Sequence, residues 1–476
     1  MDGNRAELRQ KIEGWFELHS EEMLADLKRL IGINSVKGPF ETGAPYGAGA
    51  RSALTAARFM LEERGFAVEE FEDIIITADM GPHPPLMGIL AHLDTVDPGE
   101  GWDTDPFQSV IKDGRVYGRG ALDNKGPAVA AMYAMYCVRD LCPDQINGFR
   151  LILGSGEELG CGDIALYLGK NTPPPHVFTP DSSYPVVNIE KGRITPFFGA
   201  SWEEDFALPR VISITGGKTT NVVPHSAEAV IDGFSIGDAE AWCREYSAKT
   251  GAALSARVAG GQIAITAEGA SAHAATPENG CNAQTALIGM IAAMPFANSA
   301  GFAYIRALNR LFPHGDLQGR ALGIAMSDEK TGALTVNFGV LRYSTIDLAG
   351  NFDSRTPSCA DGIDLLGMTR SALEREGLKL TNNTISKCHH TSEDSPFVQA
   401  LLGIYEEYTG NAGECLAVGG QTYVHEITGG VAFGCELPGI DNKIHGANEF
   451  IGIDQLMLSA KMFTRAILDM CGAGGL

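Results

Sequence analysis

Short apolar runs that end in polar residues constrain the fold of this chain more than any other feature. Three of them are residues 86–91 before His92, 149–153 before Gly154, and 176–179 before Pro180. Helical patterns lie between these runs, and strands that alternate with helices are typical of a mostly parallel sheet. Ligands of such sheets bind at the carboxyl ends of the strands. We therefore expect the polar residues that follow these strands to lie together at one edge of the sheet.

Helical periodicity surrounds these runs, and the pattern changes once along the chain. Amphipathic stripes predict helices at 21–31 and 51–64, and the apolar stretch 128–138 predicts a buried helix that is too short to span a bilayer. From about Lys191 the chain changes to alternating strands, and near residue 385 the earlier pattern returns. The predicted elements of these later parts are strands at 211–215, 229–233, 262–267, 333–341 and 430–434, and helices at 283–294, around 396–408 and from Asp454.

These patterns predict an α/β protein whose mostly parallel sheet is sandwiched by helices, with an inserted α+β domain. The expected boundaries are 1–190 for the first part of the catalytic domain, 191–384 for the insert, and 385–476 for the second part of the catalytic domain. A chain of 476 residues is long enough for two or three domains.

The composition indicates which kinds of partner the protein can bind and in which compartment we expect it. The chain has 36 basic and 59 acidic residues and a formal charge of −23, so a nucleic-acid backbone or an anionic membrane would repel most of its surface. The ten cysteines include no CxxC pair, which is typical of reduced thiols. The N-terminal residues 1–15 lack the apolar centre of a signal peptide. We expect a cytoplasmic protein that binds neither nucleic acid nor membrane.

Five segments hold the residues that carry chemistry. They are 91–96 (AHLDTV), 118–125 (GRGALDNK), 154–159 (GSGEEL), 180–181 (PD) and 443–449 (KIHGANE). If they converge, one pocket contains His92, Asp94, Asp123, Glu157, Glu158, Asp181 and His445. Five carboxylates in one pocket would raise one another's pKa values, so such a pocket is hard to form without cations.

Two divalent cations solve this problem of charge. With Asp123, Glu158 and Asp181 as ligands, the residual positive charge of two such ions is neutralised by one hydroxide, which is a hydrolytic balance. Mixed imidazole and carboxylate ligands suit zinc, manganese or cobalt better than calcium. Each motif alone also has an ordinary structural explanation as a turn, a helix start or a helix cap; their combination is what indicates a metal site.

The order and intervals of the five segments resemble those of the dinuclear metallopeptidase family that includes aminoacylases, succinyl-diaminopimelate desuccinylases and carnosinases. The intervals are 31 residues from His92 to Asp123, 35 to Glu158 and 23 to Asp181, with His445 far away. The resemblance covers nearly the whole chain and is greatest to the bacterial Xaa-His dipeptidase branch. It implies a zinc-exopeptidase-like catalytic domain and an insert that acts as a lid.

The resemblance implies a role for each site residue. Asp123 would bridge two metal ions, with His92 and Asp181 completing one site and Glu158 and His445 the other. Zn²⁺ is expected first, and Mn²⁺ or Co²⁺ are alternatives. Asp94 resembles the acid that orients the ligand imidazole, and Glu157 resembles the general base that activates a metal-bridging water.

Residues of the insert and of a later glycine-rich loop are implied to bind the substrate. Asn221 and His273 would stabilise the oxyanion, and Arg355 would pair with the free carboxylate of the substrate. Gly419 and Gly420 belong to a loop, GGQTY, that approaches the substrate backbone in this branch. One departure concerns specificity: Val424-His425 follow Thr-Tyr, where many such dipeptidases have a small residue and Arg.

The sequence therefore predicts a monomeric, cytoplasmic metallodipeptidase whose partner is a small dipeptide. The long insert, about 194 residues, favours this reaction over that of the aminoacylases and desuccinylases, whose inserts are typically shorter and dimerise. Deacylation of N-acyl amino acids is the alternative with the same chemistry. A non-catalytic protein that binds a peptide or a metal is the alternative from another class, and Glu157 argues against it.

Overall fold

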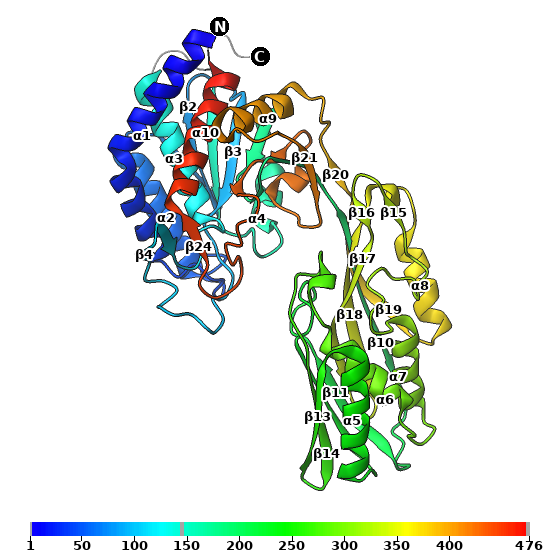
Figure 1. The fold of residues 1–476 in the computed structure, drawn as a ribbon. Helices are drawn as coiled ribbons and strands as arrows, with labels where there is room; N and C mark the ends of the chain where they lie inside the picture. Colours follow the sequence, from blue (N-terminus) through cyan, green and yellow to red (C-terminus); the bar gives the residue numbers. More distant parts are fainter. Residues whose placement is uncertain (1, 143–146, 473–476) are drawn as a thin grey trace. The chain divides into compact units, whose positions relative to one another are not determined.

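The chain forms two compact units (Figure 1). The structure is a computed structural model, and it describes residues 2–142 and 147–472. The first unit comprises Met1–Ile189, His389–Leu416 and Gln421–Leu476, and the second comprises Glu190–Cys388 and Ala417–Gly420. The second unit is thus inserted in the sequence of the first. None of the helices in the described ranges combines the length and apolar character that a membrane span requires.

A mixed sheet of nine strands lies at the centre of the first unit, as far as the described residues go. Its strands are β1 (Val68–Phe71), β2 (Ile75–Met80), β3 (Met87–His92), β6 (Phe149–Gly154), β7 (His176–Thr179), β9 (Val186–Glu190), β20 (His389–His390), β21 (Cys415–Val418) and β22 (Val431–Ala432). Their order is β1-β2-β6-β3-β7-β22-β9-β20, and β21 also pairs with β9. The centre, β6-β3-β7-β22, is parallel, whereas β2 and β9 pair antiparallel with it.

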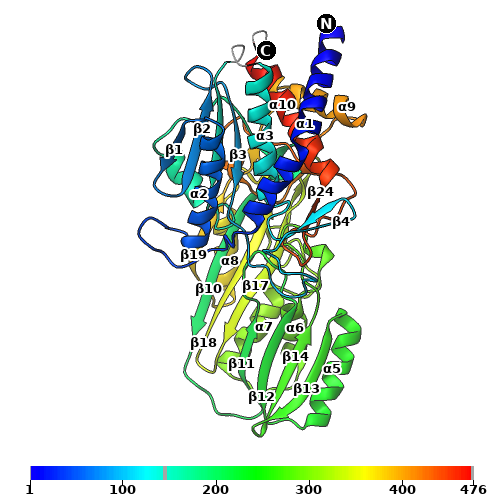
Figure 2. The same ribbon diagram turned by 90° about the vertical axis from the view of Figure 1, so that its left-hand side faces the viewer.

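Helices and two small sheets complete this unit. The helices are α1 (Asp2–Ile31), α2 (Ala48–Glu63), α3 (Lys125–Leu141), α4 (Gly162–Leu168), α9 (Pro396–Thr409), α10 (Ile453–Cys471) and the 3₁₀ helix η3 (Tyr423–Glu426). The small sheets contain β4 (Val110–Lys112), β5 (Arg115–Tyr117) and β24 (Phe450–Gly452), and β8 (Ser182–Ser183) with β23 (Cys435–Glu436). Helices α1, α3 and α10 lie side by side (Figures 1 and 2).

The central strands are buried on both faces, which explains their continuous apolar sequence. In β3, Ile89 and Ala91 join the core formed with α1, α3 and α10, whereas Leu90 joins a second core formed with α4 and η3. Successive side chains of a strand point to opposite faces, so one short run serves two layers. The predicted α/β class, with a sheet between helices, is confirmed.

The predicted elements agree with the structure at the strands that carry the site. The runs at 86–91, 149–153 and 176–179 are β3, β6 and β7, and the buried stretch 128–138 lies within α3. The antiparallel flanks were not predicted, because apolar runs report the burial of a strand and not the direction of its neighbour.

The second unit contains an eight-stranded antiparallel sheet in its described residues. Its order is β13-β14-β12-β11-β17-β18-β10-β19. The strands are β10 (Gly192–Ser201), β11 (Arg210–Gly216), β12 (Ser226–Asp232), β13 (Ala253–Ala259), β14 (Gln262–Glu268), β17 (Thr335–Tyr343), β18 (Asp347–Thr356) and β19 (Lys379–Ser386), beside the hairpin β15 (Ser327–Asp328) and β16 (Gly332–Ala333). Helices α5 (Ile236–Thr250), α6 (Ala283–Ala293), α7 (Ala300–Leu311) and α8 (Leu365–Arg375) pack on this sheet around one apolar core (Figure 2). The 3₁₀ helices η1 (Pro277–Asn279) and η2 (Ser358–Ala360) complete the unit.

The ends of the insert leave the first unit through neighbouring strands. Strand β9 precedes the insert, β20 follows it, and the two are adjacent in the sheet. The amide of Thr391 donates to the carbonyl of Asn188 at 2.9 Å, and the Asn188 side chain donates back to the Thr391 carbonyl at 2.8 Å. Hydrogen bonds therefore join the segment that precedes the insert to the segment that follows it.

One short segment belongs to a different unit from the one that its sequence position suggests. The predicted boundaries include 417–420 in the catalytic part 385–476, but this segment packs with the second unit. The Lys191 amide donates to the Val418 carbonyl at 2.9 Å, and Arg355 Nη1 donates to the Gly419 carbonyl at 2.7 Å. Both hydrogen bonds join residues distant in sequence, which periodicity cannot reveal.

Helix α1 offers a test of this packing. Leu27 is fully buried in the core, whereas Leu18 of the same helix is 83% exposed. Leu27→Ala should lower the free energy of unfolding by about 2–5 kcal/mol, since it leaves a cavity, and Leu18→Ala should change it by less than about 0.5 kcal/mol. Urea denaturation followed by circular dichroism measures both. Equal effects of the two substitutions would contradict the packing described for α1.

Candidate functional site

Three parallel strands end at the same edge of the first unit's sheet and bring four of the predicted residues there. His92 is the last residue of β3, Glu157 and Glu158 follow β6, and Asp181 follows β7. Asp123 comes from the turn before α3, and His445 comes from the loop before β24. The expected convergence at the carboxyl ends of the strands is what the structure contains.

Asp123 lies at the centre of the cluster. Its Oδ1 is 3.0 Å from Nε2 of His92, and its Oδ2 is 2.8 Å from Nε2 of His445. Nε2 of His92 is also 3.5 Å from Oδ2 of Asp181, and Nε2 of His445 is 3.1 Å from Oε1 of Glu158. The cluster thus contains two groups of three, His92–Asp123–Asp181 and Asp123–Glu158–His445, which share one carboxylate.

Each group of three has the donor atoms for a metal ion. One ligand atom of each member lies within 4.8 Å of the others. Nε2 of His92 is buried and makes no well-directed hydrogen bond in the described part of the chain, although two carboxylates lie beside it. A nitrogen that points toward carboxylate oxygens without a proper hydrogen bond fits a position between them for a cation. Imidazole nitrogen with carboxylate oxygen is a donor set for first-row transition metals.

Asp94 contacts the imidazole of His92 and the backbone of Glu157 and Glu158. Nδ1 of His92 lies 3.0 Å from the backbone carbonyl of Asp94 and 3.4 Å from Oδ1 of its carboxylate. A proton on Nδ1 would leave Nε2 unprotonated in the neutral imidazole, as a ligand nitrogen must be. The Asp94 carboxylate accepts from the amides of Glu157 at 3.3 Å and Glu158 at 3.1 Å. One side chain therefore connects the end of β3 to the loop after β6.

The surroundings of this cluster raise the pKa values of three of its members. Burial and then the charge of Asp181 raise the pKa of Glu157 well above its usual value, and burial and Asp123 raise the pKa of Glu158 to about 7. Burial alone would lower the pKa of His445, but hydrogen bonds to Asp123 and Glu158 outweigh it and raise that pKa to about 11. Without cations, the cluster therefore holds protons near neutral pH.

Sequence reasoning missed several residues that support the cluster. The loop before Glu157 is held by Asp163, whose Oδ2 accepts from the amides of Ser155 and Gly156, both at 2.8 Å, and from Oη of Tyr423 at 2.6 Å. Asn124 donates to Oδ1 of Asp181 at 2.8 Å. An acid in the first turn of a helix is common, so the sequence did not predict that Asp163 holds the loop before Glu157.

Two further acids also lie at the cluster. Burial, followed by the charges of Asp123 and Asp181, raises the pKa of Glu436 to about 7, so this acid lies within their electrostatic reach. Glu449 is fully buried beneath the turn that carries Asp123 and accepts hydrogen bonds from that turn's amides. Glu449 belongs to the fifth motif, 443–449, which the sequence analysis singled out. That motif was interpreted only for metal ligands, so it did not predict an acid that binds backbone amides.

The predicted substrate-binding residues all lie in the second unit. The amide of Ala274 donates to the Asn221 carbonyl at 2.8 Å, so the segments of Asn221 and His273 are neighbours. Arg355 is 3% exposed; its Nε donates to Asp353 at 2.7 Å, and its Nη1 donates to the Gly419 carbonyl. The second unit thus groups Asn221 with His273, and Arg355 with Gly419.

The two glycines of the loop differ in their surroundings. A Cβ at Gly419 would lie 2.6 Å from Cβ of Ala275, so a side chain does not fit there without movement. A Cβ at Gly420 would meet nothing within 4 Å, so its absence leaves open space beside the backbone. Close packing therefore explains why residue 419 is a glycine, and the approach of Gly419 and Gly420 to a substrate remains a prediction.

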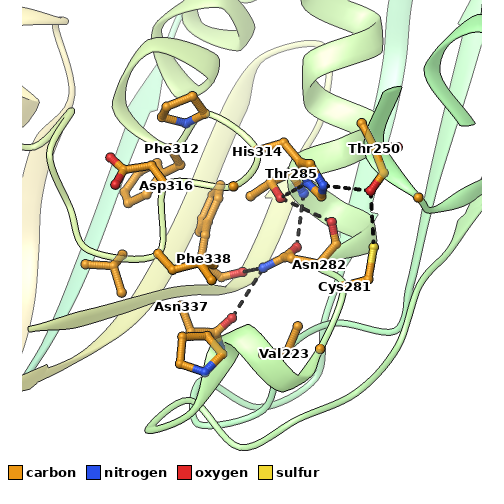
Figure 3. Close-up of a pocket in the computed structure, with 17 residues that line it drawn as sticks. Val223, Thr250, Cys281, Asn282, Thr285, Phe312, His314, Asp316, Asn337 and Phe338 are labelled. Carbon is orange, nitrogen blue, oxygen red and sulfur yellow. Dashed lines mark hydrogen bonds between the residues drawn. The ribbon is translucent and has the colours of Figure 1, made fainter. Parts of the chain in front are cut away.

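A pocket of about 280 Å³ lies elsewhere in the second unit (Figure 3). Its polar side chains are engaged with the protein: His314 contacts Thr285 at 2.9 Å and the Thr250 carbonyl at 3.1 Å, and Asn282 donates to the Phe338 carbonyl at 3.0 Å. None of the predicted site residues lines it. The predicted site residues therefore lie outside this pocket.

This chain is similar to a peptidase family and to proteins named as putative dipeptidases. Residues 88–469 match the family described as Peptidase family M20/M25/M40. A Bacillus subtilis (strain 168) protein named "Putative dipeptidase YtjP" is 33% identical over 460 residues, which cover 94% of this chain and 97% of that protein. A Staphylococcus haemolyticus (strain JCSC1435) protein named "Putative dipeptidase SH1171" is 28% identical over 95% of this chain and 98% of its own length.

Solved structures share the fold over almost the whole chain. Human carnosine dipeptidase 1 is similar with a TM-score of 0.57 and 16% identity, covering 97% of this chain and 98% of that chain. The dipeptidase Dug1p from Saccharomyces cerevisiae has a TM-score of 0.57 and 13% identity, covering 96% and 98%. At these identities the likeness concerns the fold alone.

The protons held by the metal-free cluster can be tested through their release when metal binds. The raised pKa values of Glu158, about 7, and His445, about 11, mean that both groups carry protons near pH 7 in the metal-free cluster. Metal ligands must be deprotonated, so loading the metal-free protein with Zn²⁺ should release at least about one proton per chain. Titration calorimetry in buffers of different ionisation enthalpy measures this release.

The number of protons released on metal binding should also depend on pH. As the pH rises through about 7, Glu158 loses its proton before metal is added, so the release should fall while the share of His445 persists. His445→Ala should reduce the release further. Binding without any proton release at pH 7 would contradict the protonation described for this cluster.

Proposed function

The chain belongs to peptidase family M20/M25/M40, and on this premise we propose that it is a dinuclear metallodipeptidase that hydrolyses the peptide bond of dipeptides. The observation that carries the proposal is the sharing of Asp123 between two groups of ligand atoms. The relatives named as dipeptidases support the choice of substrate. The Xaa-His branch remains our prediction for the nearest type of specificity.

Two divalent cations, with Zn²⁺ first and Mn²⁺ or Co²⁺ as alternatives, fit the donor set. His92 and Asp181 would hold one, Glu158 and His445 the other, and Asp123 would bind both. Such ions polarise the scissile carbonyl and lower the pKa of water toward neutrality. Asp94 would keep Nε2 of His92 free for an ion through its contact with Nδ1.

Glu157 is the proposed general base. Its carboxylate would take a proton from the attacking water and pass it to the nitrogen of the departing amine, which must be protonated to leave. The Glu157 amide is held by Asp94, and the two preceding amides are held by Asp163. A base on such a fixed loop keeps its position when the charges around it change.

The second unit would supply substrate recognition as a lid. We propose that Asn221 and His273 stabilise the oxyanion, that Arg355 pairs with the free carboxylate, and that Gly419 and Gly420 approach the substrate backbone. The Arg355 guanidinium is oriented by Asp353 and the Gly419 carbonyl, which supports a fixed direction for its remaining N–H groups.

Two further parts of the proposal concern the whole protein. We propose a monomer, because the long insert resembles that of monomeric dipeptidases. We also propose a cytoplasmic location, which the scattered positions of the ten cysteines, without a CxxC pair in the sequence, support.

Hydrolysis of N-acyl amino acids is the second candidate, since the same site chemistry cleaves that amide. A panel of metal-loaded assays separates the two. We expect turnover of β-Ala-His or Ala-Ala and little turnover of N-acetyl or N-succinyl amino acids, measured by the release of free amino acid. Turnover of the acylated compounds alone would assign the protein to deacylation.

Replacement of the base tests catalysis against mere binding. Glu157→Ala should lower kcat for a cleaved dipeptide by at least about 10²–10⁴-fold, because proton transfer from the water loses its acceptor. The metal content should stay near two per chain, since Glu157 is not among the ligands. Elemental analysis and stopped assays on the same preparation measure both. Activity near that of the wild type would disprove this assignment.

A further inference from the structure

A buried ion pair lies behind the shared carboxylate. Glu449 is 0% exposed and Arg119 is 1% exposed, and Nη1 of Arg119 lies 2.6 Å from Oε2 of Glu449. Neither residue belongs to the two groups that could hold a metal. An ion pair taken out of water is costly unless further hydrogen bonds satisfy it. The partners of this pair therefore indicate what it does.

Glu449 holds the turn that carries Asp123. Its Oε1 accepts from the amides of Leu122 at 2.9 Å and Asp123 at 3.1 Å, and its Oε2 accepts from the amide of Gly120 at 3.1 Å. With Arg119, four donors occupy the four lone-pair positions of the carboxylate. Glu449 has no lone pair left for a cation, so its action on the site passes through the backbone.

Arg119 connects this turn to the loop of His445. Its Nη2 donates to the Gly446 carbonyl at 3.1 Å and to the Pro98 carbonyl at 3.3 Å, while its guanidinium lies 5.3 Å from the ring centre of Trp102. Gly446 is the residue after His445, and the Glu449 carbonyl accepts from the Gly118 amide at 3.0 Å. The pair is thus bound to the segments of both Asp123 and His445.

The loop of His445 needs such support because its backbone is strained. Lys443, His445 and Asn448 have φ values of 61°, 59° and 60°, in the left-handed region that non-glycine residues rarely adopt. Strained backbone persists only where its surroundings hold it in place. The contacts of Arg119 and Glu449 at Gly446 and Gly118 supply this restraint on both sides of the loop.

We propose that Glu449 and Arg119 are positioning residues that set the distance between Asp123 and His445 and thereby make the second metal site. The group Asp123–Glu158–His445 depends on two loops that this ion pair joins, whereas His92 ends strand β3 and Asp181 follows strand β7 of the central sheet. Loss of the pair therefore weakens the second ion more than the first. The inference rests on the proposed pair of metal ions.

Titration with Mn²⁺ alone, followed by electron paramagnetic resonance, tests the proposal on the full chain. The wild type should bind two Mn²⁺ and give the spectrum of a coupled pair. Glu449→Gln keeps the size of the side chain but directs an amide toward N–H donors, so it should raise the Kd of the second Mn²⁺ about 10–100-fold and leave an isolated-ion spectrum. The first Mn²⁺ should bind nearly as in the wild type.

Arg119→Lys is the milder variant, and it decides the question if Glu449→Gln does not fold. Lysine keeps the positive charge but lacks the fork that reaches both Glu449 and the Gly446 carbonyl, so it should also weaken the second ion. A coupled spectrum and unchanged affinities in a folded variant would overturn the proposal. A wild type that binds fewer than two Mn²⁺ would instead disprove the dinuclear function itself.

Asp328→Asn is the matched control. Asp328 accepts from the amides of Thr331 at 2.7 Å and Cys359 at 2.9 Å and from the Ser358 hydroxyl at 2.9 Å, so it also holds a turn with a carboxylate, but in the second unit. This variant should retain two Mn²⁺ and the coupled spectrum. Loss of the second ion here too would show that general destabilisation suffices, and the specific role of Glu449 would be wrong.

Discussion

Electrostatic repulsion among acids at the end of a parallel sheet is the constraint on which this structure depends. Asp123, Glu157, Glu158 and Asp181 lie together with two imidazoles, and the raised pKa values of Glu157 and Glu158 express the cost of that proximity. The fold tolerates it by two means. Backbone amides hold the acids in place, and the ligand atoms form two groups in which cations can neutralise them.

Buried carboxylates that face the backbone form the second layer of the site. Asp94, Asp163 and Glu449 each accept at least two backbone N–H groups from a loop that carries a predicted ligand or base. Hydrogen bonds to a charged acceptor are stronger than those between neutral groups. The loops therefore gain a rigidity that their own sequences do not provide, and each reacting side chain starts from a fixed backbone.

Sequence predicted the class of fold and the residues that meet at the site, for a physical reason. Buried strands leave apolar runs, and the residues after them, His92, Glu157, Glu158 and Asp181, must gather at one edge if the strands are parallel. Asp123 and His445 lie in turns outside this strand pattern; their polar motifs marked them as candidates, and the family resemblance supplied their places in the two metal sites. The partners of Glu449 and Asp163, and the transfer of 417–420 to the second unit, depend on contacts between distant segments, which no local pattern encodes.

The adjacency of β9 and β20 also bears on how such proteins diversify. An insert whose two ends leave a sheet through neighbouring, hydrogen-bonded strands replaces a simple connection between them. Its length and contents can then change over evolution without altering the register of the strands that carry His92 and Asp181. The strand ends that carry the reacting residues are thus separated, along the chain, from the segment whose length can vary.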